Sequence, residues 1–182
     1  MDISESQKKE RIKASEQIES MMLFLFSLLA IMEDFSYQNV EFAVSQVRDM
    51  YVGILGASII DDYLNDYVQQ FSEQVVQTTM DHKEDEWYFS EDRAMFVAEN
   101  EANTTQNYVD YKNAVKAGKK KKKWITMRDK HVRHTHAMVD GKTLDINDIF
   151  LVGDGEMFYP KDTTFGASAN EIVNCRCSVK YF

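Results

Sequence analysis

The sequence predicts an α+β protein, with a helical arm at the amino end followed by a small α+β module at the carboxyl end. Residues 5–118 contain almost no helix-breaking residues, and the single proline is Pro160. Turn residues and short β-like runs gather after Gly118. A length of 182 residues fits one domain, or a small domain with a helical extension. We place the helical arm at residues 1–89, a long helix leading into the module at 90–117, and the module at 118–182.

The helical region carries its own start and stop signals. Ser36 and Ser90 are predicted to cap helix N-termini, and Gly53 and Gly56 to interrupt the helical pattern. We expect the helix after Ser90 to end at Gly118, because glycine readily takes the positive φ that ends many helices.

The run MMLFLFSLLAIM at residues 21–32 is the most apolar stretch. It has 12 residues, whereas a membrane-spanning helix needs about 20. No small-residue cleavage site of a signal peptide follows it. We therefore expect no membrane contact, and burial of the run either inside the chain or in a homo-oligomer formed by the N-terminal helices.

Charge is distributed unevenly along the chain, whose net charge is −9. Residues 1–117 carry 9 Lys and Arg against 22 Asp and Glu, whereas residues 118–182 carry 12 against 8. Five consecutive lysines mark the boundary, and they fit either a nucleic-acid contact or a solvated linker whose charges complement the negative end of the preceding helix. The acidic amino-terminal part argues against a protein that coats nucleic acid along its whole length. The lysines are Lys119, Lys120, Lys121, Lys122 and Lys123.

The module is predicted to contain two strands and a short helix. Residues 123–127 and 175–182 have strand-like patterns, and residues 129–139 form a helix that ends at Asp140-Gly141. Cys175, Cys177, Val179 and Tyr181 alternate, so we expect one face of the closing strand to point inward, near residues 124–127.

Three histidines and both cysteines of the chain fall in this module. His131, His134 and His136 lie within six residues, and Cys175 and Cys177 are one residue apart. Two cysteines do not form a disulfide framework, and a Cys-x-Cys pair rarely bridges to itself, so we expect free thiols. Three interpretations stay open: a metal site that joins His136 to the cysteines, a nuclease-like site in which His136 moves a proton and Arg133 holds a phosphate, or a structural network of Asp129, Arg133 and His136.

A spaced set of residues closely resembles the phage Mu protein F-like family, the minor head or head-morphogenesis proteins of tailed phages. The pattern W-I-T-x-x-D-x-x-V-R-x-x-H-x-x-x-D-G occupies residues 124–141, Tyr159-Pro160-x-Asp162 follows, and Glu171-x-x-Asn174-Cys175-Arg176-Cys177 closes it. The resemblance covers about residues 90–182. The motif positions that it marks as structurally important are Asp129, Arg133, His136, Asp140, Gly141, Glu171, Asn174, Cys175, Arg176 and Cys177.

The resemblance implies a role in virion assembly more than a reaction. It implies a low-copy protein of the virion interior, made in the bacterial cytoplasm together with portal and capsid or scaffold proteins, with a role in DNA packaging or delivery. Modules of this family also occur near toxin domains, so a small nuclease or toxin-like module is the alternative, as is a nucleic-acid-binding module that uses the lysine run.

This chain departs from the relatives that carry Cys-x-x-Cys, because it has Arg133-x-x-His136 at that place. In those relatives the cysteines look like part of a zinc site. Here zinc would have His136, Cys175 and Cys177 as ligands, with Glu171 as a candidate fourth. We expect instead no cofactor, and a salt-bridged network in which Arg133 pairs with Asp129 or Glu171 while the cysteines serve as small packing residues.

Overall fold

The computed structural model describes residues 3–56 and 58–182, and its fold class is α+β, as predicted. The chain divides into two compact units. We call Lys13–Glu99 the helical unit, and Met1–Ile12 together with Asn100–Phe182 the mixed unit. The predicted domain boundaries after residues 89 and 117 stay a prediction.

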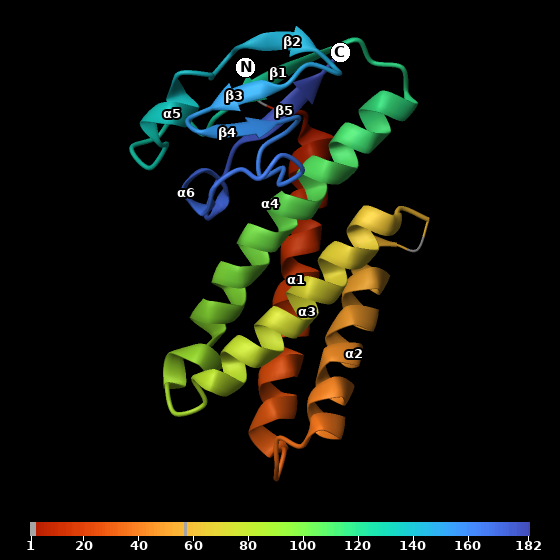
Figure 1. The fold of residues 1–182 in the computed structure, drawn as a ribbon, viewed down its shortest axis with the longest axis vertical. Helices are drawn as coiled ribbons and strands as arrows, with labels where there is room; N and C mark the ends of the chain where they lie inside the picture. Colours follow the sequence, from red (N-terminus) through yellow and green to blue (C-terminus); the bar gives the residue numbers. More distant parts are fainter. Residues whose placement is uncertain (1–2, 57) are drawn as a thin grey trace. The chain divides into compact units, whose positions relative to one another are not determined.

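Helices α1 and α4 each contribute residues to both units, whereas α2 and α3 belong to the helical unit alone. Figure 1 shows α1, α2 and α3 running side by side, with short connections between successive helices. The helices are α1 (Glu5–Ile31), α2 (Tyr37–Leu55), α3 (Asp62–Asp81), the 3₁₀ helix η1 (Glu86–Phe89) and α4 (Glu91–Lys116).

The predicted helix boundaries are largely confirmed. Ser90 caps α4, because its Oγ accepts a hydrogen bond from the backbone N–H of Arg93 at 3.2 Å. Ser36 holds the N-cap position of α2 without a side-chain capping bond. Gly53 lies inside α2, so the prediction that it interrupts the helix is wrong, whereas Gly56 ends the helix with φ +85°.

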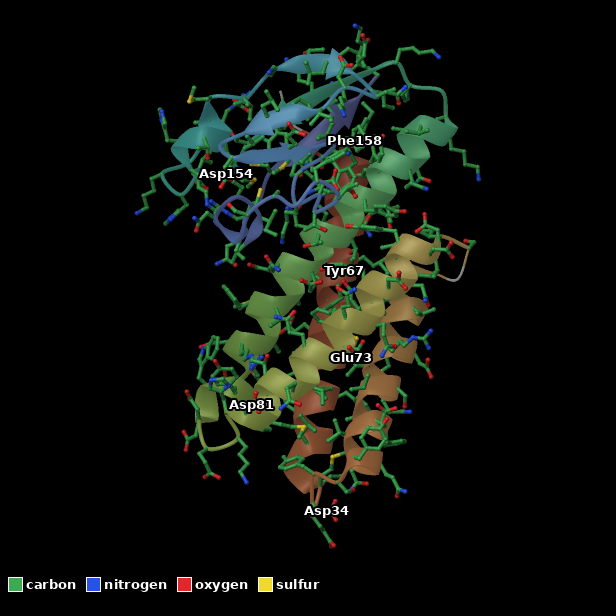
Figure 2. All side chains as sticks on the ribbon, viewed as in Figure 1. Asp34, Tyr67, Glu73, Asp81, Asp154 and Phe158 are labelled. Carbon is green, nitrogen blue, oxygen red and sulfur yellow. The ribbon has the colours of Figure 1, made fainter. Side chains whose placement is uncertain are left out.

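The turn between α1 and α2 is held by Asp34, which is labelled in Figure 2. Its carboxylate accepts hydrogen bonds from the backbone N–H of Ser36 at 2.9 Å and from the side chain of Asn39 at 2.7 Å. The bond from Ser36 is the main cause that lowers the pKa of Asp34.

The apolar run of residues 21–32 is core, as predicted. Leu25 is fully buried and Phe26 is 3% exposed, and the Phe26 ring packs 5.9 Å from that of Phe89. The helix α1 has 27 residues, so by length and composition alone it could also cross a membrane. One face of the run is buried inside the chain, whereas Phe24 and Ile31 are 39% and 78% exposed, and association of the N-terminal helices into a homo-oligomer stays a prediction. The buried residues of α1 are Ala14, Ile18, Met21, Met22, Leu25, Phe26 and Leu29.

The mixed unit contains two small antiparallel sheets. One has the strand order β2-β1-β5, and the other pairs β3 with β4. In the first sheet Trp124 lies opposite Val179 and Lys122 opposite Tyr181, which confirms that the closing strand pairs with the strand at Trp124. The elements are β1 (Lys121–Ile125), α5 (His134–Ala137), β2 (Thr143–Asp145), β3 (Phe150–Val152), β4 (Gly155–Met157), α6 (Ala169–Ile172) and β5 (Ser178–Tyr181).

Two predicted elements of the module are shorter in the structure. The helix predicted at residues 129–139 is reduced to the four residues of α5. The closing strand begins at Ser178, because the carbonyls of Cys175 and Cys177 accept hydrogen bonds from the Asn103 side chain, at 2.9 and 3.1 Å, and not from a neighbouring strand.

The lysine run is not a linker throughout, because β1 begins at Lys121. Lys122 has no exposed surface, its Nζ donates to the carbonyl of Phe158 at 2.9 Å, and it lies 5.1 Å from the ring centre of Phe150. Burial lowers its pKa to about 8. For Lys122 both predicted roles, solvated linker and nucleic-acid contact, are therefore wrong, because a buried amine reaches neither bulk water nor a phosphate.

Candidate functional site: a histidine–cysteine cluster at the closing segment

The closing segment turns both cysteines inward. Cys175 and Cys177 are free thiols and each is 3% exposed, whereas Arg176 between them is exposed. This alternation confirms the predicted inward face, although the two residues precede β5.

His136 lies between the cysteines and an acidic side chain. Its Nδ1 is 3.3 Å from Sγ of Cys177 and 3.5 Å from Sγ of Cys175. Its Nε2 is 2.9 Å from Oε2 of Glu171, and the His136 side chain is 2% exposed. Residues about 40 positions apart are thus joined through one imidazole ring, as the sequence predicted for the closing cysteines and the first helix of the module.

The cluster shifts the pKa values of its members. Burial by itself would lower the pKa of His136, but hydrogen bonds to Cys175 and Glu171 raise it above its ordinary value. The pKa of Cys175 is lowered well below that of a free thiol, first by a hydrogen bond from Cys177 and further by His136. The pKa of Cys177 is raised, because Cys175 and burial both favour its neutral form.

Glu171 is positioned by a close backbone approach that the sequence did not reveal. Its Oε2 also accepts a hydrogen bond from Oγ1 of Thr135 at 2.9 Å. Its Oε1 lies against Gly153, where an added Cβ would be 2.1 Å away, and Gly153 has φ +60°. Only glycine fits both the conformation and the space at this position. The sequence signal for this approach is the glycine-containing VGDG stretch at residues 152–155.

The predicted salt-bridged network is wrong in its partners. Arg133 donates from Nη to the carbonyl of Val173 and pairs with neither Asp129 nor Glu171. Asp129 instead pairs with Arg176 at 2.8 Å. This bond and one from the backbone of His131 lower the pKa of Asp129. Arg176 pairs with Asp129 because its side chain points away from the buried face of the closing segment, toward the exposed loop that carries Asp129.

The Asp140-Gly141 pair closes the loop after β1. The Asp140 carboxylate accepts from the backbone N–H of Thr126 at 2.9 Å and from Nε of Arg128 at 2.8 Å. Burial alone would raise the pKa of Asp140, but these two bonds lower it. Gly141 has φ +79° and its N–H donates to the carbonyl of Trp124 at 2.9 Å, so the motif positions serve to fix backbone.

A row of polar residues on α4 holds the closing segment from the side opposite His136, and no sequence motif marks these residues. Asn103 binds the carbonyls of both cysteines, and Asn107 donates to the carbonyl of Cys177 at 3.0 Å. Arg11 of α1 donates to the side-chain oxygens of Asn103 at 3.2 Å and Asn107 at 2.8 Å. The two asparagines are four residues apart on one helix, which is the spacing that places them on one face.

Asn174 takes a conformation that suits its residue type. It has φ +55°, a region that asparagine tolerates better than most residues, and its N–H donates to Oδ1 of Asn100 at 3.3 Å. Lys161 donates to the same oxygen at 2.6 Å and is buried, so its pKa falls to about 8.

The nuclease-like interpretation does not fit this geometry. Both ring nitrogens of His136 already have partners, and a side chain that is 2% exposed does not reach the phosphodiester of a nucleic acid. Arg133 donates to a backbone carbonyl.

A small pocket opens beside the cluster. It is lined by Met127, His131, Val132, Arg133, His136, Asn174, Cys175, Arg176 and Cys177.

Residues 66–180 match the family described as phage Mu protein F like protein. The chain belongs to this family. This membership supports a general place in phage head morphogenesis. The matched range holds every motif residue described above and nearly all of the mixed unit after α4.

A second comparison finds that part of this chain is similar to part of a much longer protein. A stretch of 90 residues, 47% of this chain, is 38% identical to the NAD(+)--arginine ADP-ribosyltransferase EFV of Enterococcus faecalis. The stretch spans 18% of that protein's length, so most of the enzyme has no counterpart here. No solved structure matches this chain significantly.

Proposed function

We propose that this chain is a minor head protein that binds the phage portal during capsid assembly and enters the virion interior with it. The family match over residues 66–180 carries the proposal. The hydrogen-bonded motif residues support a structural role, because Asp140 and the cysteine carbonyls fix the backbone and the buried His136 and Glu171 bind each other.

The helical unit supplies the surface for the portal. It carries 4 Lys and Arg against 17 Asp and Glu, a net charge of −13. Met95 and Phe96 at the start of its α4 segment are 47% and 48% exposed, and the Phe96 ring lies 6.5 Å from that of Trp87, which is 46% exposed. An apolar patch with an acidic surround is suited to a partner that offers apolar and basic side chains.

DNA contact belongs to the mixed unit in this proposal. Its net charge is +4, and Lys119, Lys120 and Lys121 are exposed. Lys121 is paired with Asp145 at 2.6 Å, which leaves few unpaired charges for phosphates. We therefore propose a weak, salt-sensitive contact with packaged DNA and no sequence reading.

The portal proposal is tested by co-expression of the tagged portal of the same phage with the full chain. We expect the chain to co-purify with the portal, and Met95→Ser with Phe96→Ser to weaken the capture at least tenfold. Tyr37→Ser is the matched control, because Tyr37 is also in the helical unit and is 78% exposed. Capture that is absent for the wild-type chain, or equal for both variants, contradicts the proposal.

The similarity to the EFV protein supports a second candidate, in which the module is a transferable part that accompanies an effector. The relevant activity would then belong to the other 82% of such a protein, since the match covers 18% of it. For the chain itself we propose no ADP-ribosyl transfer and no nuclease turnover. Incubation with NAD and an arginine acceptor, and separately with RNA and DNA, checks both. Turnover by the purified chain that heating abolishes would contradict the structural role, and its loss in His136→Ala would place the activity at the cluster.

A further inference from the structure

The three ligand atoms of the histidine–cysteine cluster are spaced as they would be around one metal ion. Nδ1 of His136 and Sγ of Cys175 and Cys177 all lie within 4.8 Å of one another. The two nitrogen–sulfur distances are 3.3 and 3.5 Å. A tetrahedral zinc ion with ordinary bond lengths needs such an edge to be about 3.6 Å. Two of the six edges of a tetrahedral site are therefore already close to their required length.

The orientation of the imidazole matches what a metal requires. Nε2 of His136 faces the Glu171 carboxylate at 2.9 Å. Because a carboxylate only accepts, Nε2 carries the hydrogen and the neutral ring presents the lone pair of Nδ1 to the two sulfurs. A carboxylate behind a ligating histidine is the usual outer partner in zinc sites. Glu171 is on the far side of the ring from the sulfurs, so it orients the ligand and is not itself one.

The backbone around the sulfurs is held independently of any ion. Asn103 on α4 binds the carbonyls of Cys175 and Cys177, and this fixes both residues with their side chains on one face. Two thiolates also neutralise a divalent cation, so the nearby guanidinium groups of Arg133 and Arg176 carry no repulsion against the loaded site. A pre-oriented, charge-matched donor set of this composition favours zinc over hard cations.

The open side of the cluster faces the small pocket. Its lining away from the three ligands is Met127, His131, Val132, Arg133, Asn174 and Arg176. Among these residues, His131 has the side chain that most commonly binds zinc. It is exposed on a loop, where its backbone N–H donates to the Asp129 carboxylate at 2.9 Å. We propose that His136, Cys175 and Cys177 bind a structural zinc ion, and that His131 turns into the pocket as the fourth ligand.

The first test is metal content and cobalt substitution of the full chain. We expect about one zinc per chain by elemental analysis, and Co²⁺ exchange should give tetrahedral d–d bands with thiolate-to-cobalt charge transfer. A strong chelator should lower the melting temperature of the mixed unit and not that of the helical unit. A folded chain that holds no metal and gives no cobalt–thiolate spectrum overturns the proposal in favour of a plain hydrogen-bonded cluster.

Variants test each ligand separately. Cys177→Ser should abolish the charge-transfer band of one thiolate and weaken zinc binding at least 100-fold. His131→Ala should weaken zinc about 10–100-fold and leave both thiolate bands, with folding unchanged because His131 is exposed. His134→Ala is the matched control, because His134 is exposed and lies outside the pocket lining. If His131→Ala and His134→Ala bind zinc equally well, His131 is not a ligand.

Discussion

The two units of this chain are stabilised in different ways. The helical unit is held by apolar side chains: Leu25, Val47 and Val76 are all fully buried. The mixed unit buries charged and polar groups and pairs them with backbone N–H and C=O groups or with one another. Its buried polar residues include Asn103, Asn107, Lys122, His136, Lys161, Asp162 and Glu171.

This difference determines what each unit tolerates. Apolar cores accept substitution if volume and pattern are kept, because dispersion and burial are not directional. A hydrogen bond needs its partner at a set distance and angle, and a buried polar group that loses its partner costs about 1–3 kcal/mol. We therefore expect the helical unit to be robust in sequence and the mixed unit to depend on particular residues.

The largest expected effect is deletion of residues 175–182. It removes β5 from β1 and takes away the carbonyls that Asn103 and Asn107 bind, so the mixed unit should unfold completely. The helical unit should keep its cooperative transition. The chain has two tryptophans, Trp87 in the helical unit and Trp124 in β1, so Trp87→Phe leaves Trp124 fluorescence as a reporter of the mixed unit alone. A deletion variant with an unchanged Trp124 transition would mean that the closing segment is not part of the core.

Next comes a charge in the helical core. Leu25→Asp places a carboxylate at a fully buried position of α1, at an expected cost of about 4 kcal/mol or more. Leu28→Asp, at a partly exposed position, should cost less. Phe24→Ser is the control, because Phe24 is 39% exposed in the same turn. Urea unfolding followed by circular dichroism gives the three free energies of unfolding, and equal values would contradict burial of the run.

A smaller effect is expected at Gly153. Ala at this position meets both a positive φ and the Glu171 carboxylate, and should cost about 2–3 kcal/mol in the mixed unit. Gly166→Ala is the matched control, because Gly166 has φ +74° with nothing within 4 Å and reports only the backbone strain. The difference between the two variants measures how firmly Glu171 is held; no difference would mean that its carboxylate moves aside freely.

The smallest effect is a rise in stability with pH. Burial lowers the pKa of Lys122 and of Lys161 to about 8. Above pH 8 the folded chain has lost these protons while the unfolded chain keeps them up to its ordinary lysine pKa of about 10.4, so the free energy of unfolding increases over this window. Between pH 8 and 9.5 we expect a gain of about 1–2 kcal/mol in the mixed unit.

Two lysine variants check this slope through the Trp124 transition. Lys122→Met should remove about half of the gain, because the folded state then has one buried amine fewer to deprotonate. Lys120→Met should leave it intact, because Lys120 is exposed. The raised pKa of Cys177 opposes part of this gain, because the unfolded thiol loses its proton near its ordinary pKa of about 8.5 while the folded thiol keeps it. The series stops at pH 9.5 because the raised pKa of Tyr181 adds to this opposition at higher pH. A flat profile for the wild-type chain would contradict buried, shifted lysines.

Sequence reasoning succeeded where one pattern decides the structure. The apolar run in α1, the cap at Ser90 and the stop at Gly118 are local or periodic signals, and the structure has all three. The motif spacing also identified the residues that meet at His136. The sequence does not show which polar groups bind each other. Arg133 and Arg176 carry the same charge, and only the path of the folded backbone determines that Asp129 pairs with Arg176.

The burial of Lys122 in the lysine run could not be predicted from the local sequence pattern either. Five consecutive lysines have no apolar alternation, so nothing in the pattern announces a strand. Lys122 is buried because β5 and the aromatic rings of Tyr111, Phe150 and Phe158 surround it, and these lie far away in sequence. Asn103 and Asn107 were missed for a similar reason, since their partners are backbone carbonyls about 70 residues away, which no side-chain pattern encodes.

The composition of the mixed unit also sets the order of events during translation. Gln7 donates to the carbonyl of Val179 at 3.1 Å, and Arg11 binds side chains of α4, so the first turns of α1 contact residues made 92 to 172 positions later. The helical unit, continuous from residue 13 to 99, can fold while the ribosome still holds the remainder. The first turns of α1 complete their contacts only once the closing strand β5 has left the exit tunnel, so the mixed unit forms after the helical unit.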